Sequence, residues 1–259
     1  MNCPRCNANV AFSKKRCDNC GQDLKNYRRV VGLSNIYYNK GLSQAKVRDL
    51  SGAISSLKLS LQFNKLNTNA RNLLGLVYLE EGEIVSALSE WVISKHYQSE
   101  NNDAEDYIKM IQSNPNKLET YNQTIRKYNS ALNSAKHGDE DMAIIQLKKV
   151  VNLNPKFIRA HQLLALLYMM TGKKDNRVKA LKLLRNISQI DVTNTTTLRY
   201  MKELSDVHIR GESPKVQPKV VKKEPERRTL PQVDPDAYKT ITPYKEERPS
   251  IMPFINIVV

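Results

Sequence analysis

Glycine and proline are scarce over most of this chain, which therefore offers few positions for tight turns. The 259 residues include only 9 glycines and 11 prolines, and eight of the prolines lie beyond residue 213. A hydrophobic content of 40% is enough to form a core. We therefore expect a helical body whose order ends near residue 213.

Motifs that mark common enzyme sites are also missing. The chain has no Walker loop, no dinucleotide-binding glycine motif, no G-x-S-x-G and no H-E-x-x-H. Its 4 histidines are scattered along the sequence, and none is placed as a catalytic base. These absences predict a protein that is not an enzyme.

Cysteine is confined to the first twenty residues, as Cys3, Cys6, Cys17 and Cys20. No apolar targeting segment precedes these residues, so we expect a cytoplasmic N-terminus with reduced thiols. Two C-x-x-C pairs are then metal ligands rather than disulfides, and the alternative of a redox pair would need a βαβ context. A hairpin between the pairs would bring four thiolates together as a tetrahedral site, which suits one structural zinc ion.

Residues 1–25 also resemble the zinc-ribbon family. The resemblance rests on Pro4 after the first cysteine, Gly21 after the last, and Ala11-Phe12 as a central hydrophobic pair. Asn7 departs from the glycine of many ribbons, but asparagine tolerates the left-handed conformation. The resemblance implies that the metal is structural, because four thiolates leave no open position for a substrate.

The strongest internal pattern is a repeat with a period of 34 residues. Within residues 68–101, small residues (Gly75, Ala87) and large ones (Tyr78, Trp91) stand where two helices of one antiparallel pair would cross. The same pattern recurs upstream, where a shift by one period aligns Gly41 with Gly75. A period of this length, made of helix pairs, predicts an α-solenoid.

This pattern resembles the tetratricopeptide repeat (TPR), and the resemblance covers roughly residues 30–209. It implies an all-α TPR solenoid with repeats at 34–67, 68–101, 124–157 and 158–194, a spacer at 102–123 and a capping helix at 194–209. We expect Asn114-Pro115 to break the spacer helix. The basic stretch from Lys25 to Arg29 is expected to be a linker between the ribbon and the first helix.

The TPR resemblance also implies a groove, lined by the first helix of each repeat, that binds a peptide or a partner helix. Its family positions fall on residues Asn35, Tyr38, Asn69, Asn72, Leu76, Tyr128, Leu132, Arg159, Gln162 and Leu166. Family members that bind chaperone tails hold a terminal carboxylate with Lys and Asn early in the first repeat. Tyr38 and Leu42 occupy those places here, which argues against a chaperone-tail ligand.

The C-terminal part of the sequence changes character twice. Residues 210–250 are rich in Pro, Lys and Glu, and we expect them to form a disordered, extended linker. Residues 251–259 (IMPFINIVV) are apolar, and we expect them to begin a transmembrane helix that continues beyond this sequence. The alternative is that this segment folds back into the repeat groove as an internal ligand.

The formal net charge of +15 favours an acidic partner, nucleic acid or an anionic lipid surface, although a solvated basic surface would give the same value. Taken together, the ribbon and repeats resemble bacterial zinc-ribbon plus TPR proteins, some of them anchored to the membrane by a later helix. The sequence therefore predicts a protein-protein interaction scaffold at the cytoplasmic face of a membrane. The alternative is a nucleic-acid-binding protein whose ribbon contacts phosphates through Lys14, Lys15, Arg16, Lys25, Arg28 and Arg29.

Overall fold

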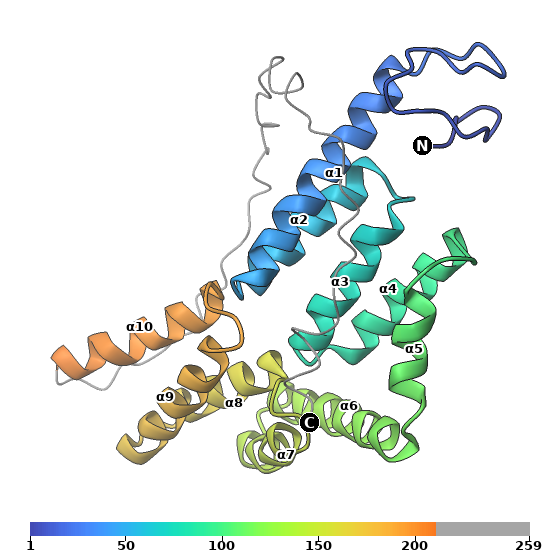
Figure 1. Ribbon diagram of the computed structural model, residues 1–259. Helices are drawn as coiled ribbons and strands as arrows, with labels where there is room; N and C mark the ends of the chain where they lie inside the picture. The colour runs from blue at the N-terminus through green and yellow to red at the C-terminus, as the bar shows by residue number, and fades with distance from the viewer. Residues whose placement is uncertain (211–259) are drawn as a thin grey trace. The chain divides into compact units, whose positions relative to one another are not determined.

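The computed structural model describes residues 1–210, and these contain ten helices after a short N-terminal ribbon (Figure 1). The helices are α1 (Lys25–Lys46), α2 (Leu50–Phe63), α3 (Thr68–Glu80), α4 (Ile84–Tyr97), α5 (Ala104–Gln112), α6 (Pro115–Lys136), α7 (Glu140–Leu153), α8 (Ile158–Met170), α9 (Lys174–Ser188) and α10 (Thr195–Arg210). In this described part, the only β-structure is two isolated bridges in the ribbon.

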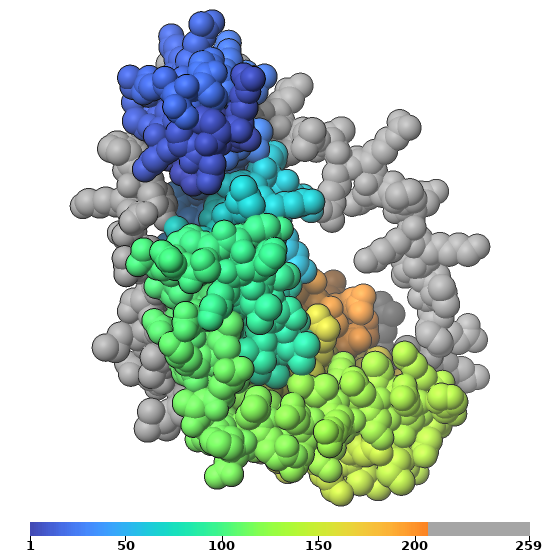
Figure 2. Space-filling view, turned by 90° about the vertical axis from the view of Figure 1, so that its right-hand side faces the viewer, coloured from blue at the N-terminus to red at the C-terminus, as the bar shows by residue number. Residues whose placement is uncertain are grey.

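Consecutive helices pack as antiparallel pairs, α1 with α2, α3 with α4, α6 with α7 and α8 with α9. Helix α5 contacts α4 and α6 and so connects the first two pairs to the last two. Figure 2 shows the face on which α4, α5 and α6 follow one another, in green. The predicted fold class, an all-α solenoid of TPR-like helix pairs, is thus confirmed for the described residues.

The helices of each pair cross closely where the sequence pairs a small residue with a large one. A Cβ atom on Gly75 would lie 2.2 Å from Nε1 of Trp91, so only glycine fits there. Trp91 is fully buried, and its Nε1 donates a hydrogen bond to the Asn72 carbonyl at 3.1 Å. A Cβ atom on Gly41 would likewise lie 2.7 Å from Cγ of Leu57 in the first pair. The predicted position of Trp91, where the two helices of one pair cross, is therefore confirmed.

Two helices begin earlier than the sequence pattern suggested. Helix α1 starts at Lys25, so the stretch from Lys25 to Arg29 is its first turn rather than a linker. Helix α6 starts at Pro115 and runs through residue 124, where the third repeat was expected to begin. Pro115 begins this helix because a proline in the first turn lacks only an N–H that would have no helical partner. The Asn114 side chain caps it by accepting from the Lys117 N–H.

Residues with a left-handed backbone lie at the turn within each helix pair. Gly82, Gly138 and Gly172 have φ values of 77°, 81° and 67° at the turns of the last three pairs. At the turn of the first pair the residue is Arg48, with φ of 60°. A left-handed conformation costs a non-glycine residue about 1–2 kcal/mol, so contacts elsewhere must stabilise this arginine.

Those contacts join the first helix pair to the loop after α9. Arg48 Nε donates to the carbonyl oxygens of Gln189 and Ile190 at 3.1 and 3.3 Å. In return, the buried Asp191 carboxylate accepts from the backbone N–H groups of Leu50 and Ser51 at the start of α2. Asp191 is only 1% exposed. It therefore acts as a cap for a helix that is far away in the sequence.

A second long-range contact joins the α3–α4 turn to the loop before α8. Asn154 donates to the Gly82 carbonyl at 3.1 Å, and the Ile158 N–H donates to the Glu81 carbonyl at 3.2 Å. In an open solenoid, each repeat contacts only its neighbours along the chain. Here the first pair also contacts the loop that follows the fourth.

The predictions for residues 210–250 and 251–259 concern a part of the chain that, apart from Arg210 at the end of α10, lies outside the described residues. Within residues 1–210, no helix combines the length and the apolar character needed to cross a bilayer.

Candidate metal centre and partner surfaces

The four cysteines lie on two loops with the same local structure. In the first loop, the Cys3 N–H donates to the Ala8 carbonyl, and the Asn7 N–H donates to the Cys3 carbonyl, both at 2.9 Å. In the second, Cys17 makes the matching bonds with Gln22 and Gly21, also at 2.9 Å. The turn residues Asn7 and Gly21 have φ values of 57° and 68°. The expectation that Asn7 adopts the left-handed conformation is therefore confirmed.

The two loops bring the four sulfur atoms together. All four Sγ atoms lie within 4.8 Å of one another, and the Cys3–Cys20 and Cys6–Cys17 distances are both 3.6 Å. A tetrahedral zinc ion with Zn–S bonds of about 2.3 Å requires sulfur atoms about 3.8 Å apart. The described cysteines form no disulfide. The arrangement thus fits a tetrahedral metal ion, as the spacing predicted.

Electrostatics also favour a cation at this position. The Ala8 N–H lowers the pKa of Cys6 to about 6. At Cys20, the Gln22 N–H lowers the pKa, but burial and the neighbouring sulfur groups outweigh it and raise the pKa to about 12. Four thiolates at these distances repel one another unless a positive ion lies between them.

The ribbon has a very small apolar core, and its composition differs from the prediction. Val10 and Leu24 are buried at 4% and 0% exposure beside the cysteines. The expected central pair is not in this core: Ala11 is exposed, and Phe12 is 37% exposed. The Phe12 ring lies under the Arg28 guanidinium, 5.4 Å away, because the hairpin packs on the first turns of α1.

The predicted groove residues differ widely in their accessibility. Asn69 and Arg159 are exposed, and Asn35, Tyr128, Leu132, Gln162 and Leu166 are half-buried. Tyr38, Asn72 and Leu76 are 2%, 3% and 1% exposed. A partner would not reach these last three side chains without a rearrangement of the helices.

Two of the predicted groove amides hold successive helices together. Asn72 donates to the Asn102 side chain, just before α5, at 2.8 Å. Gln162 donates in the same way to Asn194, just before α10, at 2.7 Å. These hydrogen bonds between helices are enough to explain why both repeats have an amide at this position, and no ligand is needed for the explanation.

The basic residues of the ribbon are accessible. Lys14, Lys15, Arg16, Lys25 and Arg29 are exposed, whereas Arg28 is half-buried. Arg28 is held against the hairpin by a hydrogen bond from its Nη1 to the Lys14 carbonyl, at 3.4 Å. The other five side chains can meet a solute without any change in the fold.

Sequence reasoning missed the buried charges where the two halves meet. Glu80 is 2% exposed and forms ion pairs with Lys156 at 2.9 Å and Arg48 at 3.5 Å. The only signal in the sequence is Arg48, which stands where the other repeats have glycine. The partners of Arg48 could not be named from the sequence, because Glu80 and the loop at Gln189 lie outside the first helix pair.

No family model matches this chain, and no relative is found among the curated proteins. Similar solved structures include the TPR domain of P58(IPK), with 16% identity and a TM-score of 0.32 over 71% of this chain and 58% of that one. YrrB, described as a TPR protein with an unusual peptide-binding site, has 20% identity and a TM-score of 0.28 over 64% of this chain and 90% of that one. The MamA protein has 17% identity and a TM-score of 0.27 over 71% and 98%. The helix-pair fold is established by the packing of this chain's own helices.

Proposed function

We propose that this protein is a non-enzymatic scaffold that binds a protein or peptide partner through the surface of its helix pairs. The observation that carries the proposal is the repeated pairing of α1–α4 and α6–α9, which leaves side chains of successive first helices accessible. Asn69 on α3 and Arg159 on α8 are the exposed members of the predicted groove. Surfaces built from stacked helix pairs serve binding rather than chemistry.

In this proposal, Cys3, Cys6, Cys17 and Cys20 hold one structural zinc ion. The ribbon core contains only Val10 and Leu24 besides buried cysteines, so metal binding supplies the free energy that folds it. We expect one zinc per chain by elemental analysis of the purified protein. The variant Cys20→Ser should lose the zinc ion. The amides of residues 1–24 should then lose their protection from hydrogen exchange, whereas those of α2 to α9 should keep theirs. A variant that retains stoichiometric zinc would contradict the four-thiolate site.

The partner surface is tested by affinity capture with the full chain, in the presence and absence of nuclease. The double variant Asn69→Ala with Arg159→Ala changes two exposed positions and leaves Asn72 and Gln162, which hold helices together, in place. Its stability is measured alongside, because Arg159 also forms an ion pair with Glu83 at 3.0 Å. A matched control replaces two exposed residues elsewhere, Ser89 and Lys149. Discrete proteins that survive nuclease and are lost only with the first variant support the groove. If the double variant captures the same proteins as the unchanged chain, the predicted groove is not the partner surface.

Tethering to the cytoplasmic face of a membrane is a further part of the proposal. It rests on the apolar composition of residues 251–259 after a linker rich in Pro, Lys and Glu. Fractionation of cells that express the native gene should place the protein with membranes. Recovery entirely in the soluble fraction would contradict tethering and leave the partner surface untouched.

A second candidate function is nucleic-acid binding by the ribbon. The observation in its favour is the accessibility of Lys14, Lys15, Arg16, Lys25 and Arg29 beside the metal centre. If it holds, random-sequence RNA or DNA binds with an affinity that falls steeply with salt. Neutralising these residues should reduce the salt slope. Binding that is absent or insensitive to salt would exclude this function.

A further inference from the structure

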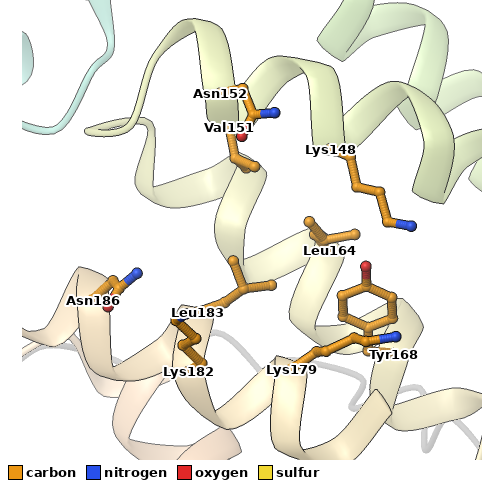
Figure 3. Close-up of a pocket in the computed structure, with 9 residues that line it drawn as sticks. All are labelled: Lys148, Val151, Asn152, Leu164, Tyr168, Lys179, Lys182, Leu183 and Asn186. Atoms are coloured by element: carbon orange, nitrogen blue, oxygen red, sulfur yellow. The ribbon is translucent and has the colours of Figure 1, made fainter. Parts of the chain in front are cut away.

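A cavity of about 300 Å³ lies between α7, α8 and α9, away from the metal centre (Figure 3). Its floor is apolar and includes Leu164 and Leu183, with Val151 beside them. Figure 3 shows Tyr168 between Lys148, which comes from α7, and Lys179, which comes from α9. Such a volume is at the lower end for ligand pockets, and it suits one or two large side chains rather than a cofactor.

The rim of this cavity is strongly basic. Lys148, Lys179 and Lys182 line it, and none of its described lining residues is a carboxylate. Between Gln146 and Ile190 the only acidic residue of the sequence is Asp175. Lys179 Nζ lies 5.9 Å from the centre of the Tyr168 ring, a cation–π distance that leaves its charge available to an anion. The rim therefore attracts negative charge, and the floor favours an apolar group.

The cavity is not the predicted groove, although both involve α8. Leu164 and Tyr168 line the cavity and are one turn apart, whereas Gln162 and Leu166 belong to the predicted groove. Residues two positions apart on a helix point in nearly opposite directions. The cavity thus offers a second surface, independent of the first.

The corresponding position in the first half of the repeat region is built differently. There, Lys58 occupies the position of Lys148, and Tyr78 occupies that of Tyr168. Lys58 Nζ lies 5.8 Å from the centre of the Tyr78 ring. Arg71 and Glu90 form an ion pair across α3 and α4 at 2.8 Å. Their counterparts in α8 and α9 are His161 and Leu183, which form no such pair, and Leu183 instead lines the cavity. Serines (Ser86 and Ser89) replace Lys179 and Lys182.

We propose that the cavity between α7, α8 and α9 binds an acidic peptide segment of a partner protein. One large apolar side chain of the peptide lies on Val151 and Leu183, the half-buried apolar residues of the lining. Carboxylates on either side of it pair with Lys148, Lys179 and Lys182. This proposal goes beyond the groove of the scaffold, because it names a different surface and the charge of its ligand.

The test uses the full zinc-loaded chain and a peptide array with Asp/Glu flanks and each large apolar residue in turn at the centre. Hits are measured by fluorescence anisotropy. The triple variant Lys148→Gln, Lys179→Gln, Lys182→Gln should weaken binding about tenfold, since three exposed ion pairs are lost. A charge-matched control replaces Lys149, Lys173 and Lys174, which do not line the cavity, and should change the affinity less than about twofold. Replacing the central apolar residue of the peptide by Gly should weaken binding similarly.

Other outcomes overturn the proposal. If both triple variants weaken binding equally, or if the Gly-centred peptide binds as well, the attraction is a general effect of charge. If no peptide of the array binds, the cavity has no such ligand. If vesicles containing phosphatidylserine bind through Lys148, Lys179 and Lys182 while the peptides do not, the surface recognises lipid instead. None of these outcomes bears on the Asn69 and Arg159 surface, so the two proposals fail separately.

Discussion

The two halves of the repeat region, α1 to α4 and α6 to α9, have the same order of helix pairs but differ in how the pairs are filled. In the first half, glycine faces a large side chain, as with Gly75 and Trp91. In the second half, alanine takes the glycine position, as at Ala165, and Leu184 takes the place of Trp91; both are fully buried. Close packing is thus reached with different volumes, and in the second half the side chains of α7, α8 and α9 leave a cavity between these helices.

The turns within the pairs differ in the same way. A Cβ on Gly82 would lie 2.7 Å from backbone atoms of Phe157, whereas a Cβ on Gly138 or Gly172 would meet no atom of the described residues within 4 Å. The turns of the first half contact the second half, and those of the second half are open. Equivalent positions in the repeats therefore tolerate different side chains, because only the turns of the first half are packed against another part of the chain.

The largest expected effect is at Trp91. Trp91→Ala removes a fully buried ring and should lower the free energy of unfolding by about 3–5 kcal/mol. Hydrogen exchange should show that protection is lost first in α3 to α5. Leu184→Ala is the matched change in the second half, and it should expose α8 and α9 instead. Uniform loss of protection in both variants would mean that the two halves unfold as one unit.

The next effect compares the turns directly. Gly82→Ala should cost about 2–4 kcal/mol, because it combines the left-handed conformation with a clash against the Phe157 backbone. Gly138→Ala has the conformational cost alone, about 1 kcal/mol. Urea denaturation of both variants measures the difference. Equal costs would show that the α3–α4 turn does not contact the α7–α8 loop in solution.

Asp191 tests the contact between the first pair and the last. Asp191→Ala leaves the N–H groups of Leu50 and Ser51 without their acceptor and should cost about 1–3 kcal/mol. It should also separate one unfolding transition into two. The control Asp139→Ala removes an ordinary cap within the second half, worth about 1 kcal/mol, and should keep a single transition. A single transition in both variants would argue against Asp191 as the link.

The smallest effect is a pH dependence at Glu81. Burial, with Asp191 and Glu83 nearby, raises the pKa of Glu81 to about 7, although Arg159 and Lys58 oppose this. The folded protein therefore holds a proton between about pH 4.5 and 7 that the unfolded chain releases, so this group's contribution to stability falls as pH rises through that range.

Glu81→Gln removes this titration and should raise the free energy of unfolding by about 1 kcal/mol at pH 8, with little change at pH 4.5. The measurement is urea denaturation at both pH values. Glu100→Gln, at an exposed position, is the control. If the Glu81 and Glu100 variants change equally with pH, the Glu81 carboxyl is not desolvated as the structure indicates.

Much of this arrangement could be predicted from local patterns. The recurrence of Gly41 and Gly75 predicted the close helix crossings, and the two C-x-x-C pairs predicted the cluster of four thiols. Helix starts were less predictable: Asn114-Pro115 was expected only to break the spacer helix, whereas it caps and begins α6. The central hydrophobic pair of the ribbon was assigned wrongly to Ala11 and Phe12, because adjacent apolar residues do not reveal which will face the metal site.

The groove residues show the limit of reasoning from repeat positions. Asn72 and Gln162 stand at a position that faces a ligand in the resembled family, yet here their amides bind Asn102 and Asn194. Hydrogen-bond partners that lie about thirty residues away depend on how successive pairs stack. The accessible positions, such as Asn69, remain a prediction.

The sequence by itself determined the all-α class, the helix pairs and the clustering of cysteines, because helical periodicity, small-to-large pairing and C-x-x-C spacing act over a few turns of chain. Only the tertiary structure decided that Arg48 contacts the loop before Asp191, that Glu80 is buried between two cations, and that three lysines surround one cavity. These features join residues from different helix pairs. Their energies depend on burial and distance, which no local pattern specifies.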